Sequence, residues 1–229
     1  ASVKFSTFPR REGVPYPQIY SRFKVKASDS DDVEEFRIQD LTENYFDQAV
    51  NFIVENHAKG AVFHRACKTL HNESGIERVR NSYRKVFEEK ISLICIKVGS
   101  EEVVGLNALH IKSRFDAPPV SDDPNFRILI ESLQYIENTF RVVDHYHVDY
   151  YMFAAGLCVD KNFRGRGIAT EILKARAGVL KAIELNVTSS IFSTVGAQKA
   201  AASAGYDENY SITYKELGKL YPQIDFAFA

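Results

Sequence analysis

The segment from Tyr150 to Val159, YYMFAAGLCV, constrains the fold most strongly because it holds ten residues and no charge. A strand with one face in water alternates apolar and polar residues, whereas this run stays apolar at successive positions. We therefore expect a central strand that is buried on both faces, in a domain that combines helices with a sheet.

Hydrophobic periodicity on either side of this segment predicts the remaining elements. Strands are expected over residues 34–41, in a hairpin over 91–111 around Gly99 and Ser100, over 187–192, and late in the chain over 210–217 and 224–229. Helices are expected from Thr42, which is placed to cap, to His57, and over 75–90, 126–140, 168–185 and 193–205. The pattern indicates one α/β domain whose chemistry lies in its second half.

The first 34 residues have a different character, with Pro9, Pro15 and Pro17 among several aromatic side chains. Because proline fixes φ and removes a backbone donor, we expect an extended arm over residues 1–34 rather than a helix. The aromatic residues are expected to pack this arm on a single domain that covers residues 35–229. A disordered tail would hold fewer of them.

Composition narrows the class of protein. The 229 residues carry a formal net charge of −1, which gives no general excess of Lys and Arg for nucleic acid or an anionic membrane surface. Cys67, Cys95 and Cys158 lie far apart, which predicts neither a disulfide framework nor a zinc site. With no signal-like apolar segment in view, we expect a cytoplasmic monomer or weak dimer that holds no metal and binds neither nucleic acid nor membrane.

The stretch that follows the buried strand, Arg164-Gly165-Arg166-Gly167, opens a helix. Glycine permits unusual backbone angles and leaves the main chain open to a ligand, and a helix N-terminus offers unpaired N–H groups with a partial positive charge. The two guanidinium groups can add charge-assisted bonds, so the pattern predicts a phosphate or pyrophosphate site. A P-loop is excluded because its lysine motif is missing, a dinucleotide fingerprint fits poorly because Thr170 occupies the third glycine position, and a loop with solvated arginines is the bland alternative.

Residues Arg164 to Ala169 resemble the R/Q-x-x-G-x-G/A signature of the GNAT superfamily of acyl-CoA-dependent N-acyltransferases. The predicted order of elements over residues 35–229 is similar to that fold. Within the superfamily, GLCVDKNFRGRGIA and the spacing from Asn186 to Tyr206 most resemble the insect arylalkylamine (dopamine-type) N-acetyltransferases. The resemblance implies an α/β GNAT-like fold: a mixed, mostly antiparallel sheet flanked by helices, with strands 4 and 5 splayed around an acetyl-CoA cleft.

The same resemblance implies that acetyl-CoA, the co-substrate, is held by main-chain groups of the central strand and by the start of the following helix. The candidate binding residues are Leu157, Cys158, Val159, Arg164, Gly165, Arg166, Gly167, Ile168, Ala169 and Thr170. From its chemistry alone, Cys158 in a buried strand is more typical of a small core residue than of a nucleophile.

The residues that the family uses for proton transfer are less well matched. The resemblance implies a glutamate where this chain has Ala61, two serines where it has Ser193 and Ala197, and a tyrosine where it has Ala201. Ser193 is therefore the one candidate catalytic residue, although a serine between a strand and a helix is also typical of an N-cap. Replacement bases could come from Glu55, His57, His64, His145, His147 or Asp149, each of which is also an ordinary surface group.

Two functions follow from these residues. One is an N-acetyltransferase in which a small primary amine, arylalkylamine-like, attacks acetyl-CoA directly in a ternary complex. The other is a protein of the same fold that binds acetyl-CoA but has lost or altered this activity and serves as a sensor or binding module. The sequence identifies neither the amine nor the base.

Overall fold

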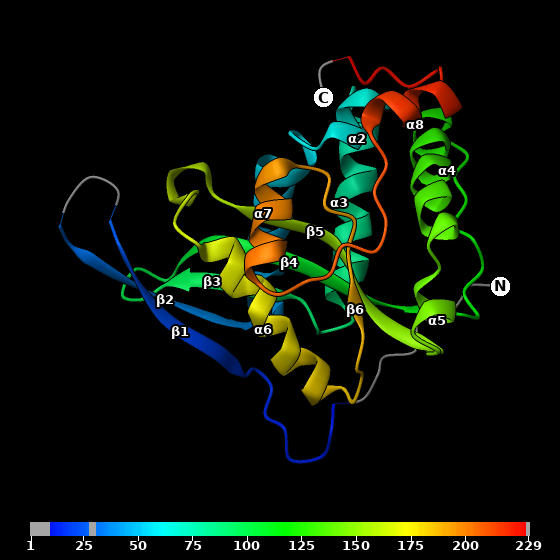
Figure 1. Ribbon diagram of the computed structural model, residues 1–229. Helices are drawn as coiled ribbons and strands as arrows, with labels where there is room; N and C mark the ends of the chain where they lie inside the picture. Colours follow the sequence, from blue (N-terminus) through cyan, green and yellow to red (C-terminus); the bar gives the residue numbers. More distant parts are fainter. Residues whose placement is uncertain (1–9, 28–30, 228–229) are drawn as a thin grey trace.

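The computed structural model describes residues 10–27 and 31–227 and has one six-stranded sheet between layers of helices (Figure 1). The strands follow the chain order across the sheet: β1 (Ile19–Lys26), β2 (Val33–Asp40), β3 (Leu93–Lys97), β4 (Glu102–Ser113), β5 (Tyr150–Val159) and β6 (Thr188–Ser189). Neighbouring strands are antiparallel except β5 and β6, which are parallel. The predicted mixed, mostly antiparallel sheet is confirmed.

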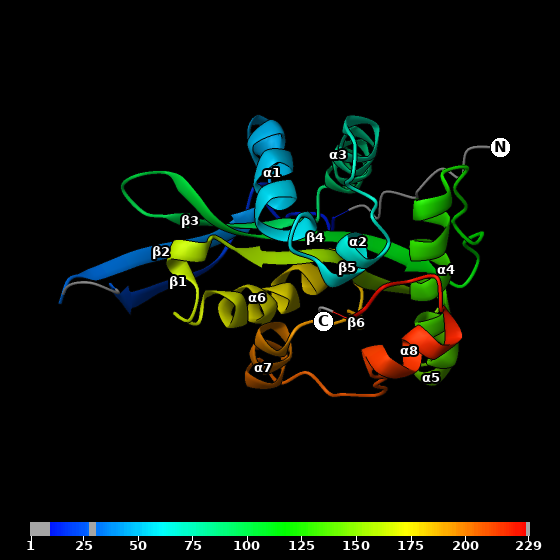
Figure 2. The ribbon, with the colours of Figure 1, turned by 90° about the horizontal axis from the view of Figure 1, so that it is seen from above.

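Helices cover both faces of this sheet (Figure 2). One face carries α1 (Phe46–Ile53), which continues into a π-helical segment, Val54–Ala58, and α3 (Glu73–Phe87). The other face carries α6 (Ile168–Ala182), and α7 (Val195–Ser203) packs on the outer side of α6. Short helices α2 (Val62–Ala66), α5 (Val142–His145) and α8 (Tyr214–Leu220) and the longer α4 (Pro124–Thr139) lie toward one end of the sheet, and 3-10 turns occur at Glu43–Tyr45 and Lys161–Phe163.

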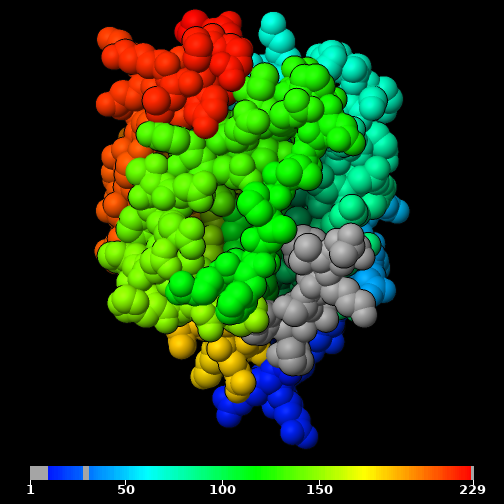
Figure 3. Space-filling view, turned by 90° about the vertical axis from the view of Figure 1, so that its right-hand side faces the viewer, coloured from blue at the N-terminus to red at the C-terminus, as the bar shows by residue number. Residues whose placement is uncertain are grey.

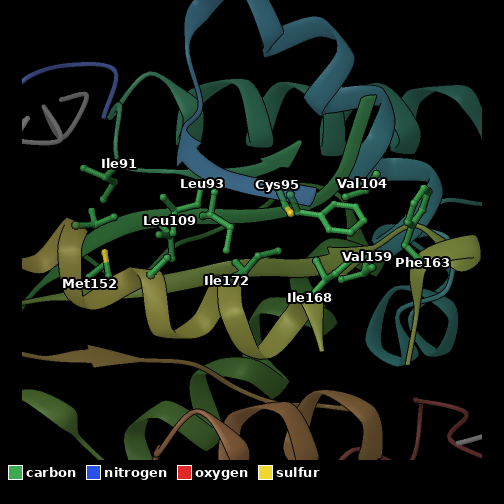
Figure 4. Close-up of a cluster of buried hydrophobic side chains, with 14 of the residues drawn as sticks. Ile91, Leu93, Cys95, Val104, Leu109, Met152, Val159, Phe163, Ile168 and Ile172 are labelled. Carbon is green, nitrogen blue, oxygen red and sulfur yellow. The ribbon is translucent and has the colours of Figure 1, made fainter. Parts of the chain in front are cut away.

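The uncharged segment β5 is buried on both sides, which explains its composition. Met152 belongs to the cluster between the sheet and α6, together with Leu93, Leu109 and Ile172 (Figure 4). Cys158 packs instead into the opposite cluster, with side chains of α1 and α3. A charged residue at either kind of position would need a buried partner, so the sequence excludes charge from this strand.

The end of the chain departs from the predicted strands over residues 210–217 and 224–229. Residues 210–213 form no regular element, Tyr214 begins α8, and residues 224–227 form no strand, while 228–229 lie outside the described residues. A capping box starts α8, because the Thr213 hydroxyl accepts from the Glu216 N–H and the Glu216 carboxylate accepts from the Thr213 N–H. Ile212, Tyr214 and Phe226 pack in a cluster with side chains of α2 and α4 instead.

Two further predicted features are shorter or different. The strand expected over 187–192 is limited to Thr188 and Ser189, because only these residues pair with β5. Thr42 does precede a helical turn, but its hydroxyl bonds the Asn44 side chain at 2.5 Å and caps no backbone N–H.

The C-terminal segment covers one end of the molecule, beside α4 (Figure 3). The Tyr221 hydroxyl donates to the Glu131 carbonyl of α4 at 3.1 Å, and the Phe226 ring meets the Phe63 ring of α2 edge-on at 5.8 Å. These contacts join the last residues to the elements that surround the cavity described below.

Part of the predicted N-terminal arm joins the sheet, because β1 pairs with β2 along its whole length. The fully buried carboxylate of Asp40 accepts from the Arg10 guanidinium at 2.5 Å, from the Tyr20 hydroxyl at 2.9 Å and from the Gln18 N–H at 2.8 Å. Residues 1–9, which include Pro9, lie outside the described residues. Within the described part of the chain, no helix is long and apolar enough to cross a membrane.

Candidate functional site

The turn between β5 and α6 has the backbone that its glycines predict. Gly165 and Gly167 have φ values of +75° and +78°, in the left-handed region that other residues seldom adopt. A Cβ atom at either position would meet nothing within 4 Å, so the requirement here is one of conformation and not of space. Gly167 is the N-cap of α6, and no side chain caps that helix, which leaves the first N–H groups of α6 available for an anion.

The two arginines of the turn point to different partners. Arg164 donates through Nε to the Val159 carbonyl at 3.0 Å and through a terminal nitrogen to the Asn56 carbonyl at 3.3 Å, and it lines the cavity. Arg166 forms an ion pair with Glu34, which also pairs with Lys97, and its guanidinium lies 5.4 Å from the Phe36 and Phe163 ring centroids. Its side chain therefore anchors the turn to the β2–β3 side of the sheet.

A cavity of about 1060 Å³ lies beside this turn and reaches across the sheet edge. Its wall includes nearly all of the predicted acetyl-CoA residues, namely Leu157, Cys158, Val159, Arg164, Gly165, Gly167, Ile168, Ala169 and Thr170, whereas Arg166 is outside it. Ser193 also lines it, from the segment before α7. The structure thus brings the predicted residues of β5, α6 and the β6–α7 connection around one space.

The cavity exists because β5 and β6 pair only at Met152 and Phe153. Immediately beyond that pair, a β-bulge leaves Ala155 without a partner in β4, since Leu109 pairs with Ala154 and Ala108 with Gly156. A bulge bends its strand and often adjoins an active site. Residues 156–159 consequently turn away from β6 and present an open strand edge to the cavity.

A fully buried arginine, Arg176 of α6, fixes the point where the two strands separate. It donates to the Asn107 side-chain carbonyl at 2.7 Å and to the Ser190 hydroxyl at 2.8 Å, and Asn107 in turn donates to the Gly156 carbonyl at 2.8 Å. These bonds connect β4, β5 and the segment after β6. Burial lowers the pKa of Arg176 from its ordinary value.

Three histidines, His57, His64 and His110, line the cavity, and all three are uncharged at neutral pH. Burial lowers the pKa of each imidazole from 6.5 to about 4, so all three are neutral near pH 7. The His64 ring bonds the Thr69 hydroxyl through Nδ1 at 2.6 Å. His57 and His64 are two of the six replacement bases expected from the sequence. His110, which lies beside Lys112 and Phe153, is not among those six.

The other predicted bases lie elsewhere. Glu55 is exposed and paired with Lys59 at 2.6 Å, and Asp149 is paired with Arg114 at 3.1 Å. His145 and His147 are exposed and are not part of the cavity wall. In the described part of the chain, no group of three or more His, Cys, Asp or Glu residues could hold a metal ion.

The positions where the resemblance implied acid and base groups lie in the cavity wall or next to it. Ala61 and Ala197 line the cavity, and Ala201 is buried beside α6. Ser193 is not the N-cap of α7: Thr194 has that role and accepts from the Ala197 N–H at 3.3 Å. The Ser193 carbonyl accepts from the Tyr214 hydroxyl at 2.5 Å, which joins this wall to α8. Burial raises the pKa of Cys158, so its sulfur is a thiol and no nucleophile.

Comparison with solved structures identifies close relatives in shape. A putative arylalkylamine N-acetyltransferase 7 from the yellow fever mosquito Aedes aegypti is 31% identical, with a TM-score of 0.88 over 94% of this chain and 91% of that one. Arylalkylamine N-acetyltransferase 2 from the same mosquito is 15% identical (TM-score 0.68, 74% and 82% covered), and a Drosophila melanogaster polyamine N-acetyltransferase is 11% identical (TM-score 0.66, 79% and 87% covered). The last two support the fold alone. No family model and no curated protein matches the sequence.

Proposed function

The chain belongs to the GNAT superfamily as an arylalkylamine N-acetyltransferase-like member, and we propose that it transfers an acetyl group from acetyl-CoA to a small primary amine. The observation that carries this proposal is the uncapped N-terminus of α6, with its two left-handed glycines, opening on a cavity beside the free edge of β5. A diphosphate needs converging N–H groups, and an extended pantetheine chain needs an unpaired strand edge; both are present.

Different residues around the cavity would bind different parts of acetyl-CoA. The main-chain N–H groups of residues 165–170 would hold the diphosphate, and the β5 edge from Leu157 to Val159 would align the pantetheine amides. Arg164 stands where its guanidinium can add positive charge. For Arg166 the proposal is limited to the main chain, because its side chain is paired with Glu34.

Bound acetyl-CoA supplies an activated thioester carbonyl, and the chain supplies a largely apolar cavity in which an amine can approach it. The acceptor part of the cavity is aromatic, with Phe63, Phe126, Phe153 and Phe192 in its wall. Within the described residues, Glu137 is the one carboxylate of this wall, and it is paired with Lys112 at 2.5 Å. An apolar wall with a neutralised carboxylate supports a monoamine with an aromatic group over a polyamine, whose second cation would have no partner.

The alternative function is a GNAT-fold protein that binds acetyl-CoA but has lost or altered the transfer reaction. The observation that favours it is the presence of alanine at both cavity positions, 61 and 197, where the resemblance implied a glutamate and a serine. Both functions require the same cofactor site, so they differ only in whether an amine reacts there.

Calorimetry with acetyl-CoA and a thiol-release assay with an amine panel separate these outcomes. We expect saturable binding and turnover with tryptamine or dopamine exceeding that with agmatine or spermidine. Binding without turnover of any amine between pH 7 and 9 would establish the alternative instead.

A charge variant tests the assigned cofactor site. Arg164→Ala should weaken acetyl-CoA binding by about tenfold through lost charge-assisted contacts. Lys181→Ala is the matched control, because it removes one positive charge from the exposed far end of α6. Equal affinities for the two variants would count against a contact between the Arg164 side chain and the diphosphate.

A further inference from the structure

His57 occupies a local irregularity of the chain that brings it to the sheet. The helix α1 widens at Ile53 into the π-helical segment Val54–Ala58, and such segments occur frequently at functional sites. Val54 and Ala58 are buried, and the segment packs on β5 and on α3. The extra residue in this turn fixes which side chain reaches the cavity.

The side chain of His57 lies directly on the backbone of β5 where that strand leaves β6. A Cβ atom added to Gly156 would lie 3.1 Å from His57 Cδ2 and 3.2 Å from the Tyr83 hydroxyl oxygen. Gly156 follows the bulged residue Ala155 and precedes Leu157 on the open edge. The imidazole therefore reaches the part of β5 that leads into the open edge proposed for the pantetheine chain.

Both ring nitrogens of His57 lack a hydrogen-bond partner among the described residues, unlike Nδ1 of His64. In the part of the chain that the structure describes, the His57 ring makes no hydrogen bond, whereas His64 uses Nδ1 to bond Thr69. Burial lowers the pKa of His57 to about 4, so the ring is uncharged at pH 7 and one of its nitrogens carries a lone pair. The ring is partly accessible and forms part of the cavity wall.

Of the described groups packed around His57, His64 alone is a second uncharged base in the cavity wall. Tyr83 of α3 has a pKa raised by burial and is therefore a donor, and its hydroxyl bonds the Ala155 carbonyl at 3.4 Å. His64 of α2 is a second neutral imidazole, and Cys158 of β5 is a buried thiol. Arg164, whose guanidinium donates to the neighbouring Asn56 carbonyl, is a cation. The Glu55 carboxylate on the same segment is exposed and paired with Lys59.

From this geometry we propose that His57 is the general base, replacing the carboxylate that Ala61 cannot supply. The inference rests on the proposed acetyltransferase function. The imidazole takes one proton from the substrate ammonium, and the free amine attacks the thioester carbonyl carbon. The C–S bond then breaks, the second proton passes from nitrogen to the thiolate sulfur, and His57 releases its proton to solvent. An apolar wall would also lower the pKa of a bound ammonium, which would reduce the pKa difference between the ammonium and His57.

The dependence of kcat/KM on pH tests this assignment. With a base that is neutral above about pH 4, the enzyme accepts the ammonium form, so log kcat/KM should be flat from pH 6 to 9. In His57→Gln only the free amine can react, so the value at pH 7 should fall about 10²- to 10³-fold and then rise about tenfold for each pH unit toward the pKa of the amine. His64→Gln, the matched control from the same cavity wall, should keep the flat profile.

The outcomes distinguish this inference from the function on which it rests. Acetyl-CoA affinity should be the same in the wild type and His57→Gln; failure of the wild type to bind would reject the proposed function and not the base. A wild-type profile that already rises tenfold for each pH unit would overturn the role of His57 without the use of any variant. If His57→Gln does not fold, His57→Ala with added imidazole provides the second test, in which recovery of the flat profile is expected and no recovery counts against the proposal.

Discussion

Acidification should destabilise the protein through the three histidines of the cavity wall, His57, His64 and His110. Each has a folded-state pKa of about 4, below the ordinary 6.5. A group whose pKa is lowered by folding contributes stability above its unfolded pKa and loses it as the pH falls through the folded value. Stability should therefore fall from about pH 6.5 downward.

The magnitude follows from these values. At pH 5 the unfolded chain has protonated almost all of each histidine and the folded chain little of it, which costs about 2 kcal/mol per residue, or about 6 kcal/mol for the three. Glu89 acts in the opposite sense, because burial raises its pKa from 4.5 to about 7, and it returns about 2 kcal/mol as the pH falls from 7 to 5. The net loss of about 4 kcal/mol is a large part of the 5–15 kcal/mol typical of a folded domain.

Urea unfolding at pH 7, 6 and 5 measures this loss. His64→Gln and His110→Gln should each remove about 2 kcal/mol of the difference between pH 7 and pH 5. His71→Gln, at an exposed histidine outside the cavity wall, should leave the difference unchanged. Equal unfolding free energies at pH 7 and pH 5 would refute the reasoning. So would a variant carrying both His64→Gln and His110→Gln that keeps the full wild-type difference between the two pH values.

Two substitutions test the packing that supports the site. Gly156→Ala should lower the unfolding free energy by about 1–3 kcal/mol, because its Cβ meets three side chains at 3.0–3.2 Å, and should also slow acetylation; unchanged stability and rate would mean that the neighbours yield freely. Asp40→Asn should cost about 3–5 kcal/mol by leaving the Arg10 guanidinium without its buried carboxylate, whereas Asp31→Asn, at an exposed pair, should cost at most about 1 kcal/mol; equal urea midpoints for these two variants would contradict this.

The sequence predicts the proposed cofactor site because the chemistry of that site belongs to the backbone. Positive φ values at Gly165 and Gly167 demand glycine, and a strand covered on both faces excludes charge, so both requirements leave a mark on residue type. The direction of the Arg166 side chain cannot be predicted from residue type in this way. Its partner, Glu34, lies 132 positions away, and a flexible guanidinium can serve either a ligand or a carboxylate.

The late part of the chain shows a limit of a different kind. Alternation at Tyr210, Ile212 and Tyr214 favours a strand, but alternation indicates only that side chains are buried on one side. Ile212 and Tyr214 are partly buried here against helices α2 and α4, not against a sheet. The competing signal was local: Thr213 and Glu216 form the capping pattern that starts α8. A strand also needs a partner, which periodicity alone does not supply.

The acid/base half was unreadable because a proton acceptor needs only a position in space, and several elements can provide it. Alanine at position 61 would imply loss of activity only if the proton acceptor had to come from that position. The structure brings the imidazole of His57 to the same cavity from the preceding π-helical turn. The position of His57 is reflected in the residue type of its neighbour on β5, Gly156. Gly156 is small because His57 and Tyr83 approach the β5 backbone there, and a strand glycine with φ in the ordinary range signals such an approach. For the proposed role of His57, the glycine inside the buried strand is therefore more informative than the alanine at position 61.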